Sequence, residues 1–134
     1  MMADLDFFKK VNDTYGHLAG DKVLSTVSKI FTNSLRIEDL AARYGGEEFV
    51  FIIPSSDKNF VLEIAENIRK QIEETIFVEE NKKFSVTISI GVVKYENKLN
   101  YKNLIALADK ALYKAKKEGR NKVFFKQYQQ EFDF

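Results

Sequence analysis

The most constraining feature of the sequence is the pair Gly45-Gly46, which separates the apolar runs 40–42 and 49–53. Glycine reaches positive φ without steric cost, so this pair between two strand-like runs predicts a tight β-hairpin turn. The adjacent carboxylates Glu47-Glu48 follow at the start of the returning strand. Neighbouring carboxylates repel each other, so a fold that holds them on a hairpin commonly supplies a cation. Taken alone, the motif also fits a solvated turn with two solubilising glutamates.

Length and composition exclude several classes of protein. A chain of 134 residues indicates one domain with a single core. Its 21 Lys and Arg nearly balance 20 Asp and Glu, so no net field would attract DNA, RNA or an anionic membrane. The chain has no cysteine, so it can form neither disulfides nor thiolate metal sites. Its single histidine, His17, argues against a metal centre built from histidines.

No targeting or membrane segment is evident in the sequence. No apolar run approaches the roughly 18–20 residues that span a bilayer. Met1-Met2-Ala3 leads directly into Asp4, without the apolar stretch of a signal peptide. A cytoplasmic domain is therefore expected, although a longer parent protein with a membrane anchor is compatible with this.

Strand and helix patterns alternate along the chain. Pro54 and Asp57 break the chain and cap the helix that follows, Asn100 opens another helix, and Gly119 ends it. Residues 84–93 alternate in character and are rich in β-branched residues, which predicts a further strand. The predicted strands are 1–5, 40–44, 48–53, 84–93 and 122–126, and the predicted helices are 18–34, 61–76 and 100–118.

This order predicts an α+β fold in which helices cover an antiparallel or mixed sheet. Its first part follows the split βαβ scheme, with a hairpin between two helices, so the first strand lies antiparallel beside the third. Asp4 and Asp6 would then meet Glu47 and Glu48 at one edge of the sheet. Such a carboxylate cluster suits Mg²⁺ or Mn²⁺, and a two-metal centre of this kind serves phosphoryl or nucleotidyl transfer.

Four sequence blocks resemble the GGDEF family of bacterial diguanylate cyclases. Residues 4–21 resemble its opening block, residues 43–49 match its name motif in the GGEEF form, and residues 85–92 and 108–121 match its later blocks. The family joins two GTP molecules into cyclic di-GMP and releases two pyrophosphates. The resemblance implies a ferredoxin-like, polymerase-palm-like sheet flanked by helices, with the motif on a hairpin.

The resemblance also implies the domain organisation. The GGDEF domain would cover residues 1–126 without the helix that normally precedes its first strand, and residues 127–134 would form a tail. Catalysis in the family requires a homodimer. An upstream sensor or receiver domain is expected in the parent protein.

The metal ligands and catalytic residues follow from the same resemblance. Asp4 and Glu47 correspond to the family's metal-holding carboxylates, and the Leu5 carbonyl and Glu48 correspond to further ligands. Glu47 and Glu48 are thus the expected catalytic residues, and Mg²⁺ or Mn²⁺ is the expected cofactor.

Two segments would bind the phosphates of GTP. Phe7, Phe8 and Lys9 lie where the family's backbone amides and a lysine meet the phosphates. Lys116 and Arg120 resemble its triphosphate-binding residues, and their spacing of four places both cations on one helix face. Helix-terminal charges that favour the helix dipole are the alternative for the lysines of this helix.

Asn12 and Asp21 match the family's guanine-binding pair. A carboxylate accepts from the guanine N1–H and N2 amine, while an amide donates to a ring acceptor. Without the resemblance, Asn12-Asp13 and Gly16 would be interpreted as a polar turn after a short helix.

Arg36 and Asp39 have the spacing of the family's RxxD inhibitory site, where product binds. The alternative is a surface ion pair, usually worth little. A second arginine is less evident, because Asn67 lies near its expected place and Arg69 two residues later. The sequence therefore predicts a diguanylate cyclase, with a non-catalytic GGDEF module that binds GTP or cyclic di-GMP as a regulatory sensor as the alternative.

Overall fold

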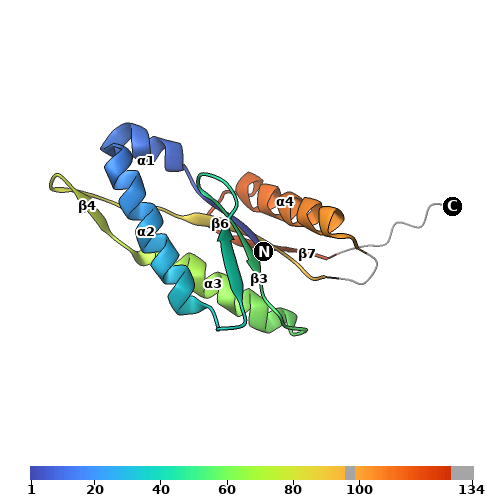
Figure 1. The fold of residues 1–134 in the computed structure, drawn as a ribbon. Coiled ribbons are helices and arrows are strands. Elements are labelled where there is room, and N and C mark those ends of the chain that lie inside the picture. The colour runs from blue at the N-terminus through green and yellow to red at the C-terminus, as the bar shows by residue number, and fades with distance from the viewer. Residues whose placement is uncertain (96–98, 128–134) are drawn as a thin grey trace.

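One mixed sheet organises the molecule (Figure 1). The computed structural model describes residues 1–95 and 99–127. The sheet has the order β2-β3-β1-β6-β7, antiparallel throughout except for the parallel pair β6 and β7. This confirms the predicted α+β class and the predicted antiparallel neighbours. The strands are β1 (Met2–Leu5), β2 (Leu40–Arg43), β3 (Glu48–Ile52), β6 (Ile88–Val93) and β7 (Val123–Lys126).

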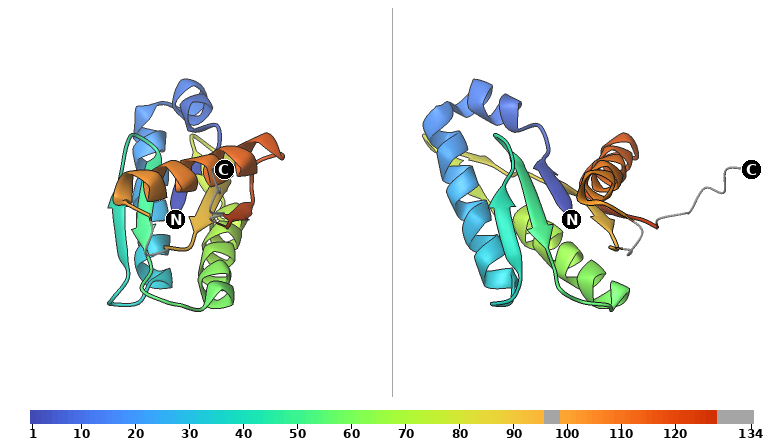
Figure 2. Two further views of the ribbon diagram at one scale, coloured as in Figure 1. Left: turned by 90° about the vertical axis from the view of Figure 1, so that its right-hand side faces the viewer. Right: turned by 45° about the vertical axis from the view of Figure 1, so that its right-hand side comes forward.

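Helices cover both faces of this sheet. Figure 2 shows α2 (His17–Ser34) and α3 (Lys58–Glu74) on one face and α4 (Tyr101–Lys117) on the other. The predicted caps are confirmed, since Asp57 and Asn100 accept backbone N–H groups at the starts of α3 and α4. No helix in the described ranges is long and apolar enough to cross a membrane. The main core under α2 and α3 includes Val23, Val27, Phe31, Ile68, Ile72, Ile88 and Ile90.

The predicted helix over 18–34 is preceded by a second helix, α1 (Phe8–Tyr15). Gly16, with a φ of 93°, separates α1 from α2. The polar-turn interpretation was therefore wrong for Asn12 and Asp13, which lie within α1. Buried Phe8 and Val11 on one face of α1 explain the helix, because they pack into the core.

The predicted strand over 84–93 is divided in the structure. Its first residue ends a two-stranded hairpin, β4 (Phe77–Glu79) and β5 (Lys82–Phe84), which projects beside α2 (Figure 1). The turn residues Glu80 and Asn81 have φ values of 49° and 66°, and positive φ at both central residues is what a two-residue hairpin loop of type I′ requires. Phe84 stacks on Tyr15 with ring centroids 4.1 Å apart, so packing fixes it in this hairpin.

The hairpin of the Gly-Gly motif is confirmed, but the predicted reason for its glycines is wrong. β2 pairs with β3 from Leu40 opposite Ile52 to Arg43 opposite Phe49. Positive φ among the described glycines occurs at other positions, and Gly45-Gly46 does not adopt it. The turn is held instead by Arg43, whose Nε donates to the Gly46 carbonyl at 2.9 Å. A Cβ at Gly46 would meet no described atom within 4 Å, so its backbone faces open space.

Of the predicted tail over 127–134, the structure describes only Gln127, and the rest lies outside the described residues.

Candidate active site

The motif carboxylates lie where β1 ends and β3 begins, in the middle of the sheet. Asp4 on β1 pairs directly with Glu48 on β3, and the Leu5 N–H donates to the Glu47 carbonyl at 3.2 Å. Residues paired across antiparallel strands share one face of the sheet, so the two carboxylates lie on the same side. The predicted meeting of the first strand with the motif is confirmed. It occurs between central strands, because β1 lies between β3 and β6.

Asp4 and Glu48 share an environment that disfavours two negative charges. Asp4 is buried, at 5% exposure, and its carboxylate forms an ion pair with the Lys116 ammonium of α4. Burial raises the pKa of Asp4, and the Lys116 hydrogen bond opposes this shift. Burial also raises the pKa of Glu48, with repulsion from Asp4 as the next cause. The site therefore favours a bound cation.

The oxygen ligands at this position fit Mg²⁺ shared with a substrate. Mg²⁺ is commonly bound by one or two carboxylates together with substrate phosphates and waters. Asp4, Glu48 and the Leu5 carbonyl match that donor set. In residues 1–95 and 99–127, no group of three or more His, Cys, Asp or Glu side chains could hold a metal by itself. The arrangement suits a metal site completed by phosphate oxygens better than an all-protein cage.

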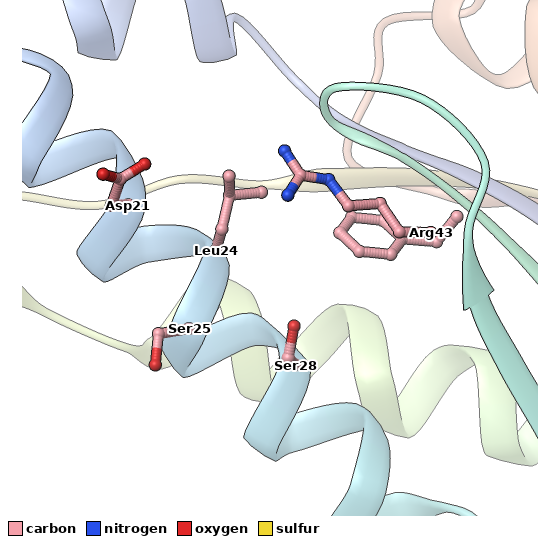
Figure 3. A pocket seen from close by; sticks show the side chains of 6 residues that line it. Asp21, Leu24, Ser25, Ser28 and Arg43 are labelled. Atoms are coloured by element: carbon pink, nitrogen blue, oxygen red, sulfur yellow. The ribbon is translucent and has the colours of Figure 1, made fainter.

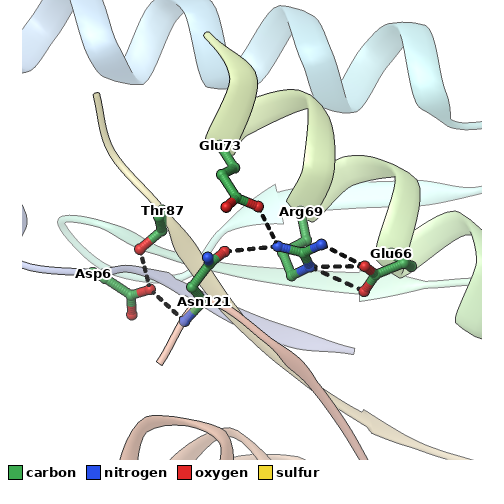
Figure 4. Close-up of polar contacts among 6 residues, drawn as sticks. All are labelled: Asp6, Glu66, Arg69, Glu73, Thr87 and Asn121. Atoms are coloured by element: carbon green, nitrogen blue, oxygen red, sulfur yellow. Dashed lines mark hydrogen bonds and ion pairs between the residues drawn. The ribbon is translucent and has the colours of Figure 1, made fainter. Parts of the chain in front are cut away.

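Asp6, expected in the same cluster, serves a different role (Figure 4). It is buried, at 4% exposure, and its carboxylate accepts from Thr87 Oγ1 and Ser89 Oγ, both at 2.7 Å. The backbone N–H of Asn121 donates to it at 3.0 Å. The four-carboxylate cluster was therefore wrong for Asp6, because β6 and the segment after α4 occupy its oxygens.

The N-terminus of α1 presents backbone donors near this site. Phe7 is the N-cap residue, with a left-handed φ of 56° and no side-chain capping bond. The first amides of a helix have no partner within the helix, so those of Phe8 and Lys9 can bind an anion. Phe8 itself is buried in the core, and Lys9 is exposed.

The end of α4 and the turn after it bring two cations to the same place. The expected shared helix face is wrong, because α4 ends at Lys117 and Arg120 lies beyond it. Lys116 contacts Asp4, and the guanidinium of Arg120 lies over the Phe7 ring, 4.6 Å from its centroid. Arg120 has a left-handed φ of 63°, a conformation that costs a non-glycine residue about 1–3 kcal/mol and persists where surrounding structure enforces it. Predicted phosphate-binding residues from both ends of the chain thus lie together.

A cavity of about 280 Å³ lies between α2 and the motif hairpin (Figure 3). Its volume is close to the ~300 Å³ at which ligand pockets begin. Asp21 lines it, as expected for a guanine site, whereas Asn12 is not among its lining residues and lies against Gly20 of α2. A Cβ on Gly20 would lie 1.9 Å from the Asn12 amide oxygen, so any larger residue there would displace the Asn12 side chain. The remaining lining residues are Leu24, Ser25, Ser28, Arg43 and Phe49.

Sequence reasoning assigned no role to Arg43, which links this cavity to the hairpin. Figure 3 shows its guanidinium extending toward α2, and its Nε and Nη2 donate to the carbonyls of the motif turn. The residue belongs to the motif block at 43–49, so the block itself contained the signal. Ser25 and Ser28, on α2, had no comparable signal.

Arg36 and Asp39 form a separate, tightly bonded pair. Arg36 Nη2 and Nε donate to the two carboxylate oxygens of Asp39 at 2.9 and 3.2 Å, and Nη2 also donates to the Pro54 carbonyl. The Asp39 side chain is fully covered, and the Arg36 hydrogen bond lowers its pKa. Arg69 does not join this pair, because it is bonded to Glu66, Glu73 and Asn121.

Comparison with known proteins places the chain in one family. The family profile described as "Diguanylate cyclase, GGDEF domain" matches residues 1–122. The chain is 49% identical over 124 residues to Diguanylate cyclase A of Treponema denticola, covering 92% of this chain and 33% of that protein. It is 48% identical over 128 residues to the probable diguanylate cyclase DgcT of Escherichia coli, covering 92% of this chain and 28% of that protein. The chain thus spans a third or less of these relatives.

Solved structures agree with the sequence matches. The GGDEF domain of DgcB from Caulobacter crescentus, solved in complex with c-di-GMP, superposes with a TM-score of 0.89 at 33% identity, covering 92% of this chain and 74% of that one. The active GGEEF domain of a diguanylate cyclase from Vibrio cholerae gives a TM-score of 0.84 at 32% identity, covering 97% of this chain and 81% of that one. The chain therefore belongs to the GGDEF domain family of diguanylate cyclases.

Proposed function

We propose that this chain is a catalytic diguanylate cyclase domain that condenses two GTP molecules into cyclic di-GMP and releases two pyrophosphates. The observation that carries the proposal is the convergence of Asp4 and Glu48 with Lys116, Arg120 and the open N-terminus of α1. Paired carboxylates beside cationic and amide donors suit a metal-bound triphosphate. The domain would comprise residues 1–126, with 127–134 as its tail.

Asp4, Glu47, Glu48 and the Leu5 carbonyl would hold Mg²⁺ or Mn²⁺. A metal bound there would lower the pKa of the attacking hydroxyl and neutralise charge that develops on the phosphate. Lys116 is already seated against Asp4, so its ammonium can help to balance the negative charge of a bound triphosphate.

The other residues would bind and orient GTP. The amides of Phe7 and Phe8 with Lys9 would contact the phosphates, and the forked guanidinium of Arg120 would bind a phosphate bidentately. Asp21 would accept from the guanine N1–H and N2 amine, and Asn12 would donate to a ring acceptor.

Two protomers would act together as a homodimer. Each would hold one GTP, and each 3′-oxygen would form a bond to the α-phosphorus of the other GTP as pyrophosphate leaves. An upstream sensor or receiver domain in a longer protein would raise the local concentration of the partner protomer.

Product would also bind at a regulatory site formed by Arg36 and Asp39. A guanine nucleotide would have to replace part of the bidentate contact between Arg36 and Asp39. The forked Arg36 guanidinium would then suit its phosphate, and the released carboxylate its base edge. A similar domain was solved in complex with c-di-GMP, which supports product binding by this fold.

The test is direct. The chain is incubated with GTP and Mg²⁺, and cyclic di-GMP is measured by chromatography with mass detection, with EDTA as the control. We expect product only with the metal, and an initial rate that rises faster than linearly with protein concentration. GTP or cyclic di-GMP binding without turnover, at any protein concentration, would favour the regulatory sensor instead.

A further inference from the structure

We propose that Asn121 is a positioning residue that fixes Arg120 for binding the GTP triphosphate, and that Asp6 and Arg69 hold Asn121 in place. This inference rests on the proposed function. Asn121 contacts neither the paired carboxylates nor the base cavity among the described residues, yet it is bonded through both its backbone and its side chain.

The backbone of Asn121 is held by a buried carboxylate. Its N–H donates to Asp6 Oδ2 at 3.0 Å. Asp6 is itself fixed, because Ser89 on β6 and Thr87 just before it donate to its two oxygens. Hydrogen bonds to a charged acceptor are short and strong, so this contact ties the segment after α4 firmly to β1 and β6.

The side chain of Asn121 is held from the opposite direction by α3. Arg69 Nη1 donates to its Oδ1 at 2.9 Å (Figure 4). Arg69 is fixed in turn by Glu66, whose carboxylate accepts from Nε at 3.0 Å, and by Glu73 at 2.6 Å. Its side chain is 15% exposed. Asn121 therefore lies in a continuous polar network that runs from β6 through β1 to α3.

The consequence concerns the neighbouring arginine. Gly119, Arg120 and Asn121 have successive φ values of 118°, 63° and 49°, a run that an arginine adopts only when adjacent contacts enforce it. The helix supplies one contact, from the Arg120 N–H to the Ala115 carbonyl at 3.0 Å. Asn121 supplies the next contact, beyond the helix, through its N–H bond to Asp6. With both ends held, the Arg120 guanidinium lies over Phe7 instead of moving freely.

The experiment separates positioning from general stability by comparing two ligands. Calorimetry gives the affinities of the parent and of Asn121→Ala for GTP and for GMP, which lacks the outer phosphates. We expect Asn121→Ala to weaken GTP binding about tenfold and GMP binding less than about twofold, because misplacing a binding group by an ångström can cost up to ~100-fold. Arg69→Ala should reproduce the selective loss, and Arg69→Lys should restore part of it.

Two variants serve as controls. Asn121→Gly retains the left-handed backbone and the N–H to Asp6, so it should lose less GTP affinity than Asn121→Ala, and it keeps the test valid if the alanine variant does not fold. Asn81→Ala changes another left-handed asparagine, in the remote β4–β5 turn, and should leave both affinities unchanged.

If Arg120→Ala lowers GTP affinity selectively while Asn121→Ala and Asn121→Gly leave it at the parent value, the inference is overturned and the proposed function stands. A parent chain that binds neither GTP nor GMP would overturn both.

Discussion

The Asp4 carboxylate and the Lys116 ammonium form an ion pair that joins β1 to α4 across 112 positions of the chain. Their side chains are 7% and 29% exposed, so the pair lies largely within the protein. Both partners have a proposed function, Asp4 as a metal ligand and Lys116 as a triphosphate contact. The charge balance of the site is thus built into the packing of α4 on the sheet.

The first prediction concerns the stability of the nucleotide-free protein. A carboxyl whose pKa is raised in the folded state gives its full contribution below its unfolded pKa and loses it as pH rises through the folded value. The pKa of Glu48 is raised from 4.5, so its charge destabilises the fold at neutral pH. We expect Glu48→Gln to raise the Tm at pH 8 and to raise it by less at pH 5.

Thermal melts of both proteins in EDTA at the two pH values measure this difference. Glu63→Gln, on the exposed side of α3, should give no such pH-dependent gain. A gap between Glu48→Gln and the parent that stays constant from pH 5 to pH 8 would contradict the proposed origin in charge burial.

The second prediction concerns Glu47. Glu47→Gln should abolish cyclic di-GMP formation, because it removes a metal-ligand charge, and should change stability by no more than about 0.5 kcal/mol, because a hairpin loop carries little core packing. Product assays and urea melts measure the two effects. Glu80→Gln makes the same change in the turn of the β4–β5 hairpin and should leave turnover intact. Normal activity in Glu47→Gln would show the metal assignment to be wrong.

The third prediction concerns base choice. Asp21 lines the cavity between α2 and the hairpin, and adenine offers it neither an N1–H nor an N2 amine. Asp21 is exposed in this structure, and a bound base would cover it. An acceptor covered without a partner costs about 1–3 kcal/mol, so the parent should bind GTP at least about fivefold more tightly than ATP, and Asp21→Ala should lose most of this preference. Asp13→Ala, on exposed α1 surface, is the control. Equal affinities of the parent for GTP and ATP in Mg²⁺ would refute the assignment.

Much of this architecture could be predicted because local patterns and topology agree. The Gly-Gly hairpin and the order of elements placed β1 beside β3, and that pairing alone brings Asp4 opposite Glu48. The part that failed depends on side-chain direction and long-range packing. Alternation along a strand would place Asp4 and Asp6 on the same face, but Asp6 lies just beyond β1. Thr87 and Ser89, more than 80 positions away, donate to its oxygens, which no local pattern reveals.

Two further misses have similar causes. Alternation over 84–93 does not show that Phe84 stacks on Tyr15 of α1, and this contact assigns it to a separate hairpin. The hydrogen bond from Arg69 to Asn121 joins residues 52 positions apart, so sequence spacing gave no indication of it. The short helix before Gly16 was expected to end earlier, because Asn12 and Asp13 were interpreted as part of a polar turn, whereas α1 continues to Tyr15.

The fourth prediction concerns product binding. Arg36→Lys should weaken cyclic di-GMP binding about tenfold or more, because a lysine ammonium cannot form the bidentate contact of the guanidinium, and it keeps a positive charge beside the covered Asp39 carboxylate. Calorimetry with cyclic di-GMP measures the effect, and the initial rate without product should stay at the parent value. Unchanged product affinity would mean that Arg36 and Asp39 form only a structural ion pair.

The fifth prediction tests how closely α4 must approach the sheet. A Cβ on Gly91 of β6 would lie 2.3 Å from the Leu112 nitrogen and 2.7 Å from the Ala108 carbonyl oxygen, both in the backbone of α4. Backbone cannot move aside as a flexible side chain can, so Gly91→Ala should push α4 outward and destabilise the fold by about 1–3 kcal/mol. Because α4 carries Lys116 and leads into Arg120, GTP affinity should fall more than GMP affinity.

Gly46→Ala, whose Cβ would meet no described atom within 4 Å, should leave the unfolding free energy unchanged. A Gly91→Ala variant with parent stability and parent GTP affinity would show that α4 does not need this close contact to position its cations.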